Sequence, residues 1–387
     1  MRGAGRILGV DGTRVLVASV SERVWLEAGA HDLVAPGDWV EWRKDADADA
    51  PAELTLVQKA PEPRGNGEVA RFLLGEKGAL LRERHRALRI LRDYFDSRGF
   101  LEVDTPTVVP CPGLDSHVHS LGEVASERSF GYLRTSPEFH MKRLLVGGFD
   151  KIYQIAPCYR AEEQGTWHEP EFTMVEWYEA FSSFEDLLRS TEELVRHLCL
   201  TLTGKSELRR GDQPGSLASV SEPFERLSVQ EAFSEFTGQS DVADLAASEP
   251  ELYFELLATR IEPELARLPR PVFLYHYPLS QAALATPVPG APEFAERAEL
   301  YALGIELANG FAELTNPVEQ RRRFILEQER RRRAGETVYP LDEHFLSALG
   351  EGMPPSIGNA LGFDRLLALC LGSRGIAPIL AFSSQEK

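Results

Sequence analysis

The chain has 387 residues, 43% of them hydrophobic and 26% charged, which is typical of a globular protein with one large domain and a small module. Its 60 acidic and 42 basic residues give a net charge of −18, which disfavours a large nucleic-acid footprint because the phosphate backbone is also anionic. Four scattered cysteines without a C-x-x-C pair predict neither zinc nor disulfides, and the lack of a long apolar run predicts a cytoplasmic protein without a membrane span.

Residues 1–63 have the pattern of a small β-barrel that is similar to an OB-type barrel. Turn signals such as Asp11-Gly12 and Pro36-Gly37 separate short runs with strand character. The expected strands are 6–10, 13–20, 23–27, 38–43 and 53–58. The acidic, alanine-rich stretch 45–52 is expected to be a flexible loop. A proline- and glycine-rich stretch at 60–68 opens a linker that we place at 64–79, before a large domain at 80–387.

The large domain alternates helical and extended patterns. Apolar residues at helical spacing predict a helix from about Leu80 that ends near Gly99, followed by an extended segment at 100–103. We expect a strand–loop–strand unit at 151–181, helices at 184–200, 317–334 and 365–371, and a loop at 205–222. Neither G-x-G-x-x-G nor G-x-x-x-x-G-K-[ST] occurs. These patterns together predict an α+β fold.

The strand–loop–strand unit contains a first group of residues with chemical potential. Glu176 and Tyr178 share one face of the second strand, and both faces are so apolar that Glu176 is expected to be a buried carboxylate. Such a group needs a cationic partner or ligand. Arg160 ends the first strand, with Glu162 two residues later, and its guanidinium could bind a phosphate. The alternative is that Arg160, Glu162 and Glu176 form a structural ion-pair network.

A second group lies in the segment 296–314. Glu299 and Glu306 are seven residues apart, so a hairpin that turns near Gly304 would place them on neighbouring strands, where both can face one cavity. Two adjacent carboxylates need a cation, and Mg²⁺ takes one or two carboxylates plus phosphate oxygens. Asn309 and Glu313 alternate further along the second strand. The alternative is a solvated hairpin edge with ordinary surface glutamates.

A third group lies at 356–372, where a strand meets a helix. Gly358 and Gly362 flank the strand, and Arg365 lies in the first turn of the helix, so this helix start could hold a phosphate tail. The alternative is a salt bridge between Asp364 and a neighbour.

Two other patterns carry less weight. Arginines at 321–323 and 330–333 are interleaved with glutamates, which favours a solvated helical face over RNA binding. His117 and His119 are only two ligands, which is weak evidence for a metal.

The three groups, in this order and spacing, resemble the signature motifs of class II aminoacyl-tRNA synthetases. Residues 81–106 resemble motif 1, 153–178 motif 2 and 357–370 motif 3. From about residue 80 to the C-terminus the chain is most similar to the elongation factor P β-lysine ligases, a family of lysyl-tRNA synthetase paralogues. The tracts that carry this similarity are TSPEFHMKRLL (135–145), PEFTMVEWY (170–178), GIELANGFAEL (304–314), EGMPPSIGNALGFDRL (351–366) and IAPILAFS (376–383).

The resemblance implies a central antiparallel sheet flanked by helices, a homodimer formed through motif 1, and the use of ATP and Mg²⁺. Arg160 and Arg365 would be catalytic, at the α- and γ-phosphates, and Glu299 and Glu306 would bind the metal. ATP would also be bound by Glu162 at the adenine amino group, His168 near the phosphate tail, Glu169, Phe172 on the adenine ring, Glu306, Leu307 and Gly362. The amino acid would be bound by Ser136, Pro137, Glu138, Glu176, Tyr178, Asn309, Glu313 and Ala360, with Glu176, Tyr178, Asn309 and Glu313 at its two amino groups.

The resemblance also implies the reaction. We expect ATP to activate a lysine-type amino acid, in particular (R)-β-lysine, as its adenylate, followed by transfer to a lysine ε-amine of elongation factor P. Ala360 stands where lysyl-tRNA synthetases have glycine, and Glu169 replaces an expected asparagine. The β module is an addition to the usual single catalytic domain of this family. The alternatives are a short lysyl-tRNA synthetase, although tRNA is not the expected partner, and a non-catalytic sensor of amino acid or nucleotide.

Overall fold

The computed structural model divides into two compact units, Met1–Glu83 and Arg84–Lys387. The structure describes residues 1–19, 23–27, 34–44, 51–60, 67–114, 118–125, 130–161 and 163–386. In these ranges, no helix combines the length and the apolar character that a membrane crossing requires.

The first unit contains a five-stranded antiparallel sheet in the order β3-β2-β1-β4-β5. Its strands are β1 (Arg2–Asp11), β2 (Arg14–Ala18), β3 (Arg23–Glu27), β4 (Trp39–Arg43) and β5 (Glu53–Gln58). Alternate residues such as Ile7, Val15 and Val40 form its core. The amide of Ala52, just before β5, donates to the carbonyl of Glu27 at the end of β3 over 2.6 Å, which joins the two outer strands. The five strands predicted from the sequence are confirmed.

The segment between the sheet and the large unit is largely helical where it is described. Within the range expected to be a linker, Val69–Leu74 forms the π-helix η1, and α1 (Lys77–Asp96) begins at Lys77. The predicted amphipathic pattern of α1 is confirmed, because Ala87, Leu91, Tyr94 and Phe95 are buried. Gly99 then adopts a positive φ of 78°, as a turn after a helix requires. Most of the acidic loop expected at 45–52 lies outside the described residues.

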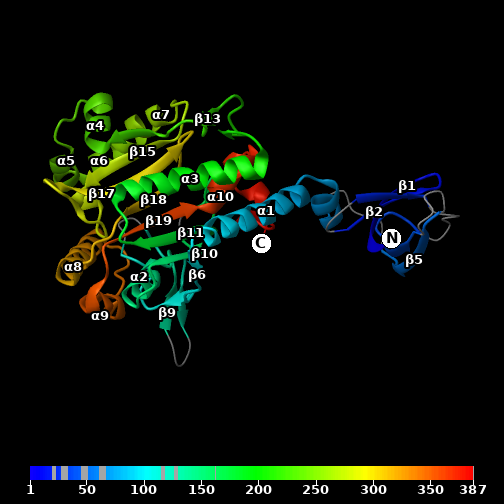
Figure 1. The fold of residues 1–387 in the computed structure, drawn as a ribbon, viewed down its shortest axis with the longest axis horizontal. Helices are drawn as coiled ribbons and strands as arrows, with labels where there is room; N and C mark the ends of the chain where they lie inside the picture. The colour runs from blue at the N-terminus through cyan, green and yellow to red at the C-terminus, as the bar shows by residue number, and fades with distance from the viewer. Residues whose placement is uncertain are drawn as a thin grey trace. The chain divides into compact units, whose positions relative to one another are not determined.

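A nine-stranded sheet forms the centre of the second unit (Figure 1). Its path is β14-β15-β17-β18-β19-β11-β10-β6, with β16 beside β17. Neighbours from β15 to β10 are antiparallel, as predicted, whereas the edge pairs β14/β15 and β6/β10 are parallel, which the sequence did not predict. The strands are β6 (Leu101–Glu102), β10 (Lys151–Tyr159), β11 (Glu171–Ala180), β14 (Glu225–Ser228), β15 (Val272–Pro278), β16 (Pro287–Val288), β17 (Ala291–Ala302), β18 (Ile305–Ala312) and β19 (Ser356–Gly362).

Helices cover both faces of this sheet (Figure 1). On one face, α3 (Phe184–Thr203) packs on β18 and β19, and α10 (Phe363–Leu371) packs on β11 and α3. On the other, α2 (Glu138–Val146) packs on β11 and on α9 (Glu343–Gly352), which contacts α8 (Pro317–Ala334). The remaining helices are α4 (Val229–Thr237), α5 (Val242–Ser248), α6 (Pro250–Leu256), the π-helix η2 (Leu257–Ile261), α7 (Glu262–Leu265), and the 3₁₀ helices η3 (Leu279–Gln281), η4 (Ala377–Ile379) and η5 (Ser384–Glu386).

Two short sheets complete the second unit. The region 205–222, expected to be a loop, contains a hairpin of β12 (Glu207–Arg209) and β13 (Leu217–Ser219), so that expectation was wrong. These strands are three residues long, which is too short for an alternating pattern to reveal them. A second sheet pairs β9 (Phe130–Leu133) with β7 (Val108–Val109) and β8 (Glu123–Ala125).

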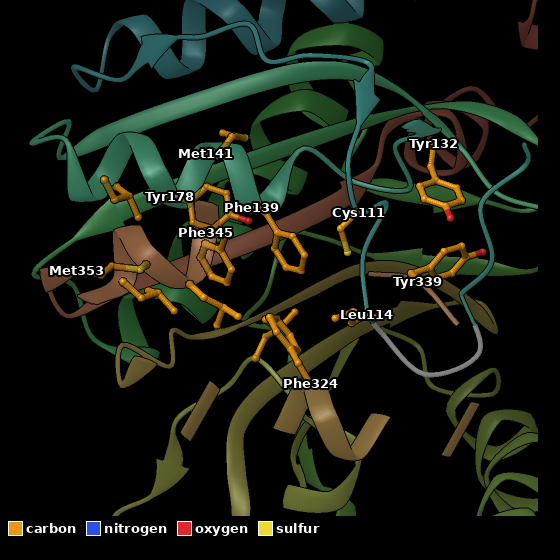
Figure 2. Close-up of a cluster of buried hydrophobic side chains, with 14 of the residues drawn as sticks. Cys111, Leu114, Tyr132, Phe139, Met141, Tyr178, Phe324, Tyr339, Phe345 and Met353 are labelled. Carbon is orange, nitrogen blue, oxygen red and sulfur yellow. The ribbon is translucent and has the colours of Figure 1, made fainter. Parts of the chain in front are cut away.

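An aromatic core holds α2 in place against the sheet. Figure 2 shows Phe139 and Met141 of α2 in one cluster with Phe324 of α8 and Phe345 of α9. The rings of Phe139 and Phe345 stack with their centroids 4.7 Å apart. Tyr178 of β11 belongs to the same cluster. The helix that follows the TSPE tract is therefore anchored directly to the strand that carries Glu176.

The arginines of α8 are not all on a solvated face, which corrects the interpretation from the sequence. Arg331 is fully buried, and its guanidinium donates to Glu327 and to the carbonyl of Val118 over 2.9 Å. Arg323 is also buried and donates to the carbonyls of Ala282 and Ala285. Charge patterning alone does not show which arginines of a helix face a neighbouring segment.

We predict that Arg331→Met lowers the free energy of unfolding of the second unit by about 2 kcal/mol, because the carbonyl of Val118 loses this charged donor, while Glu327 keeps its pair with Arg330. Arg333→Met is the matched control, because this side chain is 83% exposed on the same helix, and it should change stability by less than about 0.5 kcal/mol. Urea denaturation followed by tryptophan fluorescence measures both. Equal effects of the two substitutions would contradict the structural role of Arg331.

Candidate active site

A β-bulge in the hairpin of β17 and β18 places the two predicted metal carboxylates on one face. The two-residue turn, Leu303-Gly304, has positive φ at both positions, as a type I′ hairpin turn does. The pairing runs Glu299↔Asn309 and Tyr301↔Glu306, with a register shift between them. Because of this shift, Glu306 and Asn309 face the same side despite their odd spacing. The predicted hairpin is therefore confirmed, including its turn at Gly304.

A polar row crosses four neighbouring strands of the sheet. Glu176 of β11 pairs with Ala360 of β19, Ala360 pairs with Asn309 of β18, and Asn309 pairs with Glu299 of β17. Cross-strand partners project to the same face, so these residues from three distant segments lie side by side. In the adjacent row, a Cβ at Gly358 would collide with the carboxylate of Glu313 and the ring of Tyr178. Gly358 therefore makes room for both side chains.

Glu176 lies at the centre of this face with only hydroxyl partners. Its two carboxylate oxygens accept hydrogen bonds from Ser136 Oγ over 2.7 Å and from the Tyr178 hydroxyl over 3.2 Å. The side chain is buried, and none of the salt bridges in the described part of the chain reaches it. Burial, followed by the nearby charge of Glu138, raises the pKa of Glu176 to about 8. The structural pairing of Glu176 with Arg160, considered from the sequence, is not found.

Lys142 is a residue of this site that the sequence analysis missed. Its ammonium lies between the carboxylates of Glu138 and Glu313 and forms an ion pair with each. Burial lowers the pKa of Lys142, but the two carboxylates outweigh burial and raise it above its ordinary value. The signal was present in the sequence, since Lys142 follows Glu138 by four residues on a predicted substrate tract. The partner Glu313, 171 positions away along the chain, could not be identified in that way.

The two predicted metal carboxylates have different surroundings. Glu299 accepts hydrogen bonds from Tyr277 over 2.5 Å and Tyr301 over 2.7 Å, and its other oxygen pairs with Arg297 over 2.5 Å. Glu306 is paired with Arg365 over a longer 3.6 Å, and its side chain is 40% exposed. The carboxylate of Glu306 is therefore the one more open to a ligand.

The charges of the two arginines predicted to bind phosphate both act on Glu306. Arg160 stacks over the Phe172 ring at 5.2 Å and pairs with Glu163 over 3.3 Å, and its buried Nε has no hydrogen-bond partner among the described residues. Arg365 donates to the carbonyls of Trp167 over 3.1 Å and Glu306 over 3.0 Å. Glu162, the predicted partner of the adenine, lies outside the described residues.

Asp364 forms the salt bridge that was considered as an alternative for motif 3. One oxygen pairs with Arg84 of α1, and the other accepts a 2.7 Å hydrogen bond from the amide of Thr173. This leaves the neighbouring Arg365 directed elsewhere, so the salt bridge is confirmed for Asp364, and the phosphate site at Arg365 stays a prediction. The contact also ties α1, β11 and α10 together next to Phe172.

The loop between β10 and β11 is fastened to the C-terminal segment. Glu169 is buried and accepts a 2.9 Å hydrogen bond from the amide of Ser384. The carbonyl of Thr166 accepts another, over 3.0 Å, from Ile376. Burial, followed by the charge of Arg365, lowers the pKa of His168, so this side chain is neutral at pH 7. The negative charge that replaces the expected asparagine thus has a partner of its own.

These residues suit Mg²⁺ bound together with a phosphate. In the part of the chain that the structure describes, no group of three or more His, Cys, Asp or Glu side chains could hold a metal ion. Mg²⁺ does not need such a group, because it uses one or two carboxylates and completes its shell with phosphate oxygens and water. The open carboxylate of Glu306, the nearby Glu299 and the unpartnered Nε of Arg160 fit such a complex.

Comparison with known proteins agrees with this geometry. The family described as tRNA synthetases class II (D, K and N) matches residues 71–386. The chain belongs to this family. It is 38% identical to the elongation factor P–(R)-β-lysine ligase of Edwardsiella ictaluri over 315 residues, which cover 79% of this chain and 95% of that protein. It is also 38% identical to the ligase of the same name from Vibrio cholerae, covering 78% of this chain and 94% of that protein.

A second kind of relative within the family is longer. The chain is 33% identical to the lysine–tRNA ligase of Syntrophomonas wolfei over 324 residues, which cover 78% of this chain but 63% of that protein. The family resemblance seen in the three motifs is thereby confirmed.

The raised pKa of Glu176 predicts proton release when a cationic amino acid binds. The ligand-free protein holds a proton on Glu176 below about pH 8, so this group makes stability fall as the pH rises from 4.5, its ordinary pKa, to about 8. A bound ammonium favours the ionised form. Burial also raises the pKa of Glu313, in the same cluster, to about 8. At pH 7 we expect Glu176 to release about one proton per amino acid bound, beyond any proton from Glu313, and calorimetry in buffers of different ionisation enthalpy measures the total.

Glu176→Gln should abolish this proton release and weaken amino-acid binding by about 100-fold, because the pocket loses its uncompensated charge. Glu179→Gln, on the opposite face of the same strand, is the control and should behave like the unmodified protein. Proton release that is as large in the Glu176→Gln protein as in the unmodified protein would assign it to another group, such as Glu313.

The different surroundings of the two carboxylates predict different magnesium requirements. Glu306→Gln should raise the Mg²⁺ concentration for half-maximal ATP–pyrophosphate exchange by about 100-fold, and Glu299→Gln by about 10-fold, because Glu299 is largely occupied by protein donors. Magnesium titrations of exchange at saturating amino acid give both values. A larger effect at Glu299 than at Glu306 would contradict this order.

Proposed function

We propose that this protein activates (R)-β-lysine with ATP and transfers it to a lysine ε-amine of elongation factor P. In the first step, the carboxylate of the amino acid attacks the α-phosphorus of ATP, forming the adenylate and releasing pyrophosphate. In the second, the acceptor amine attacks the carbonyl carbon, forming an amide and releasing AMP. The names of the relatives that align over nearly their full length support this reaction.

The observation that carries the proposal is a cluster of buried carboxylates beside β11. Glu176 is buried and forms no salt bridge with the described residues, while Glu138 and Glu313 lie close by. An ammonium group of a diamino acid would supply the missing positive charge. Such a pocket disfavours neutral and acidic amino acids, because it would leave Glu176 uncompensated.

Arginines and a metal would manage the phosphates. Arg160 would hold the α-phosphate, and Arg365 the γ-phosphate, with Phe172 on the adenine ring. Magnesium, when bound at Glu306 and Glu299, would neutralise charge on the phosphates. Fixed positive groups of this kind stabilise the charge that develops at the transferred phosphorus without a covalent nucleophile on the protein. Leu307, Gly362 and His168 would line the nucleotide site.

Asn309 is assigned a different group of the substrate than the sequence suggested. Its Oδ1 accepts a 3.1 Å hydrogen bond from Arg297, and a guanidinium can only donate, so the amide presents its NH₂ group. A donor suits the carboxylate of the amino acid rather than an amino group. Ala360 lies between Asn309 and Glu176 in the polar row. Its methyl group would therefore contact the substrate where an α-amino and a β-amino group differ in position.

The runner-up is a lysyl-tRNA synthetase, which the similarity to a lysine–tRNA ligase favours. The net charge of −18 and a β module of about 60 residues count against it. A non-catalytic sensor is disfavoured by the presence of both arginines and both metal carboxylates. We also propose a cytoplasmic homodimer formed through motif 1, with α1 and β6 at its interface.

The experiment that tests the proposal offers the purified protein two acceptors. We expect elongation factor P to gain the mass of one lysyl group with (R)-β-lysine and ATP, while total tRNA remains uncharged. ATP–pyrophosphate exchange should prefer β-lysine over α-lysine, and Ala360→Gly should narrow that preference. Efficient charging of lysine tRNA, while elongation factor P stays unmodified, would favour the runner-up. If none of the amino acids supports ATP–pyrophosphate exchange, the sensor would be favoured.

A further inference from the structure

Lys142 is a fully buried lysine in the wall of the amino-acid pocket. It lies on α2, four residues after Glu138, and none of its side chain is exposed. Its ammonium pairs with Glu138 and Glu313 and lies 5.0 Å from the centre of the Phe311 ring, on the side of the sheet that carries Glu176. A buried ammonium is retained only where such partners compensate it.

The ionisation of the carboxylates around Glu176 depends on Lys142. Three carboxylates, those of Glu138, Glu176 and Glu313, lie near one another, and the charge of Glu138 acts on both of the others. Without Lys142, two adjacent buried carboxylates would not both remain ionised, because like charges in a buried site favour protonation of one of them. Burial raises the pKa of Glu313 to about 8, and Lys142 opposes this rise. When the ammonium groups of a bound diamino acid favour the ionised forms of Glu176 and Glu313, the three carboxylates and Lys142 together have a net charge of −2, which matches those two ammonium groups.

The position of Lys142 distinguishes it from a lysine in an ordinary structural ion pair. Glu138 follows Ser136, whose hydroxyl contacts Glu176, and the amide of Glu138 also donates to that hydroxyl over 3.0 Å. Glu313 packs against Tyr178 and Gly358 at the end of β18. Both partners of Lys142 thus belong to the same contacts that shape the surroundings of Glu176.

We propose that Lys142 is a positioning residue that acts as an internal counter-cation, opposing the protonation of Glu138 and Glu313 and holding both in place so that the site selects amino acids with two ammonium groups. This inference rests on the proposed function for the identity of the substrate. It assigns to Lys142 no contact with ATP and no part in the chemical step. Its loss therefore affects amino-acid binding and selectivity, and not nucleotide binding.

The test measures amino-acid and ATP binding separately by calorimetry, with the full-length protein. Lys142→Met keeps the length of the side chain and removes the charge. We expect the dissociation constant for β-lysine to rise by about 100-fold, that for ATP to change by less than about 3-fold, and the preference for β-lysine over norleucine, which has one ammonium group, to narrow. Arg143→Met, the next residue on α2, is the matched control and should leave all three quantities unchanged.

A second variant keeps the test informative if Lys142→Met does not fold. Lys142→Ala leaves space for a propylammonium ion, and propylammonium chloride should restore β-lysine binding, whereas tetramethylammonium chloride, at the same ionic strength, should not. Unchanged β-lysine affinity in Lys142→Met, or equal losses for β-lysine and ATP, would overturn the inference. So would a Lys142→Ala protein that propylammonium does not rescue. If the unmodified protein binds no diamino acid, the proposed function fails instead.

Discussion

The compensation of buried carboxylates is the constraint on which the rest of this structure depends. Glu176, Glu299 and Glu313 are each less than 10% exposed and lie on or beside the central strands of one sheet. A carboxylate in such a place is unfavourable unless other groups compensate its charge. The protein compensates them in different ways: Glu299 by a guanidinium and two phenols, Glu313 by an ammonium, and Glu176 by hydroxyl groups alone. Of these three carboxylates, Glu176 alone forms no salt bridge with the residues that the structure describes.

This arrangement explains several features of the fold around the site. The bulge in β18 turns Glu306 toward the face of Asn309, and Gly358 leaves room for Tyr178 and Glu313. The aromatic cluster of α2, α8 and α9 holds α2 so that Lys142 reaches both of its partners. The packing of these helices maintains the geometry of the ion pairs, and an ion pair compensates burial only where its geometry is maintained.

The site is also divided by charge along the sheet. Arg160 and Arg365 form a positive region that we propose binds phosphates, and the carboxylates around Glu176 form the region that we propose binds a diamino acid. Arg297 contacts residues of both regions, because it pairs with Glu299, a predicted metal carboxylate, and also orients the amide of Asn309. Preorganised charge of this kind would support the attack of a carboxylate on the α-phosphorus of ATP, with pyrophosphate leaving, without a covalent intermediate on the protein.

The sequence by itself determined the family, the five strands of the β module, the main helices and the hairpins that carry Glu176, Glu299 and Glu306. These follow from local periodicity, turn residues and motif spacing, all of which act over a few residues. The partners of those carboxylates were decided only by the tertiary structure. Lys142 pairs with Glu313, Glu169 accepts a hydrogen bond from Ser384, and Arg331 donates one to Val118, each across a long stretch of chain. Such pairs depend on strand register and helix packing, so spacing along the chain does not reveal which charged side chains are compensated and which one remains for a ligand.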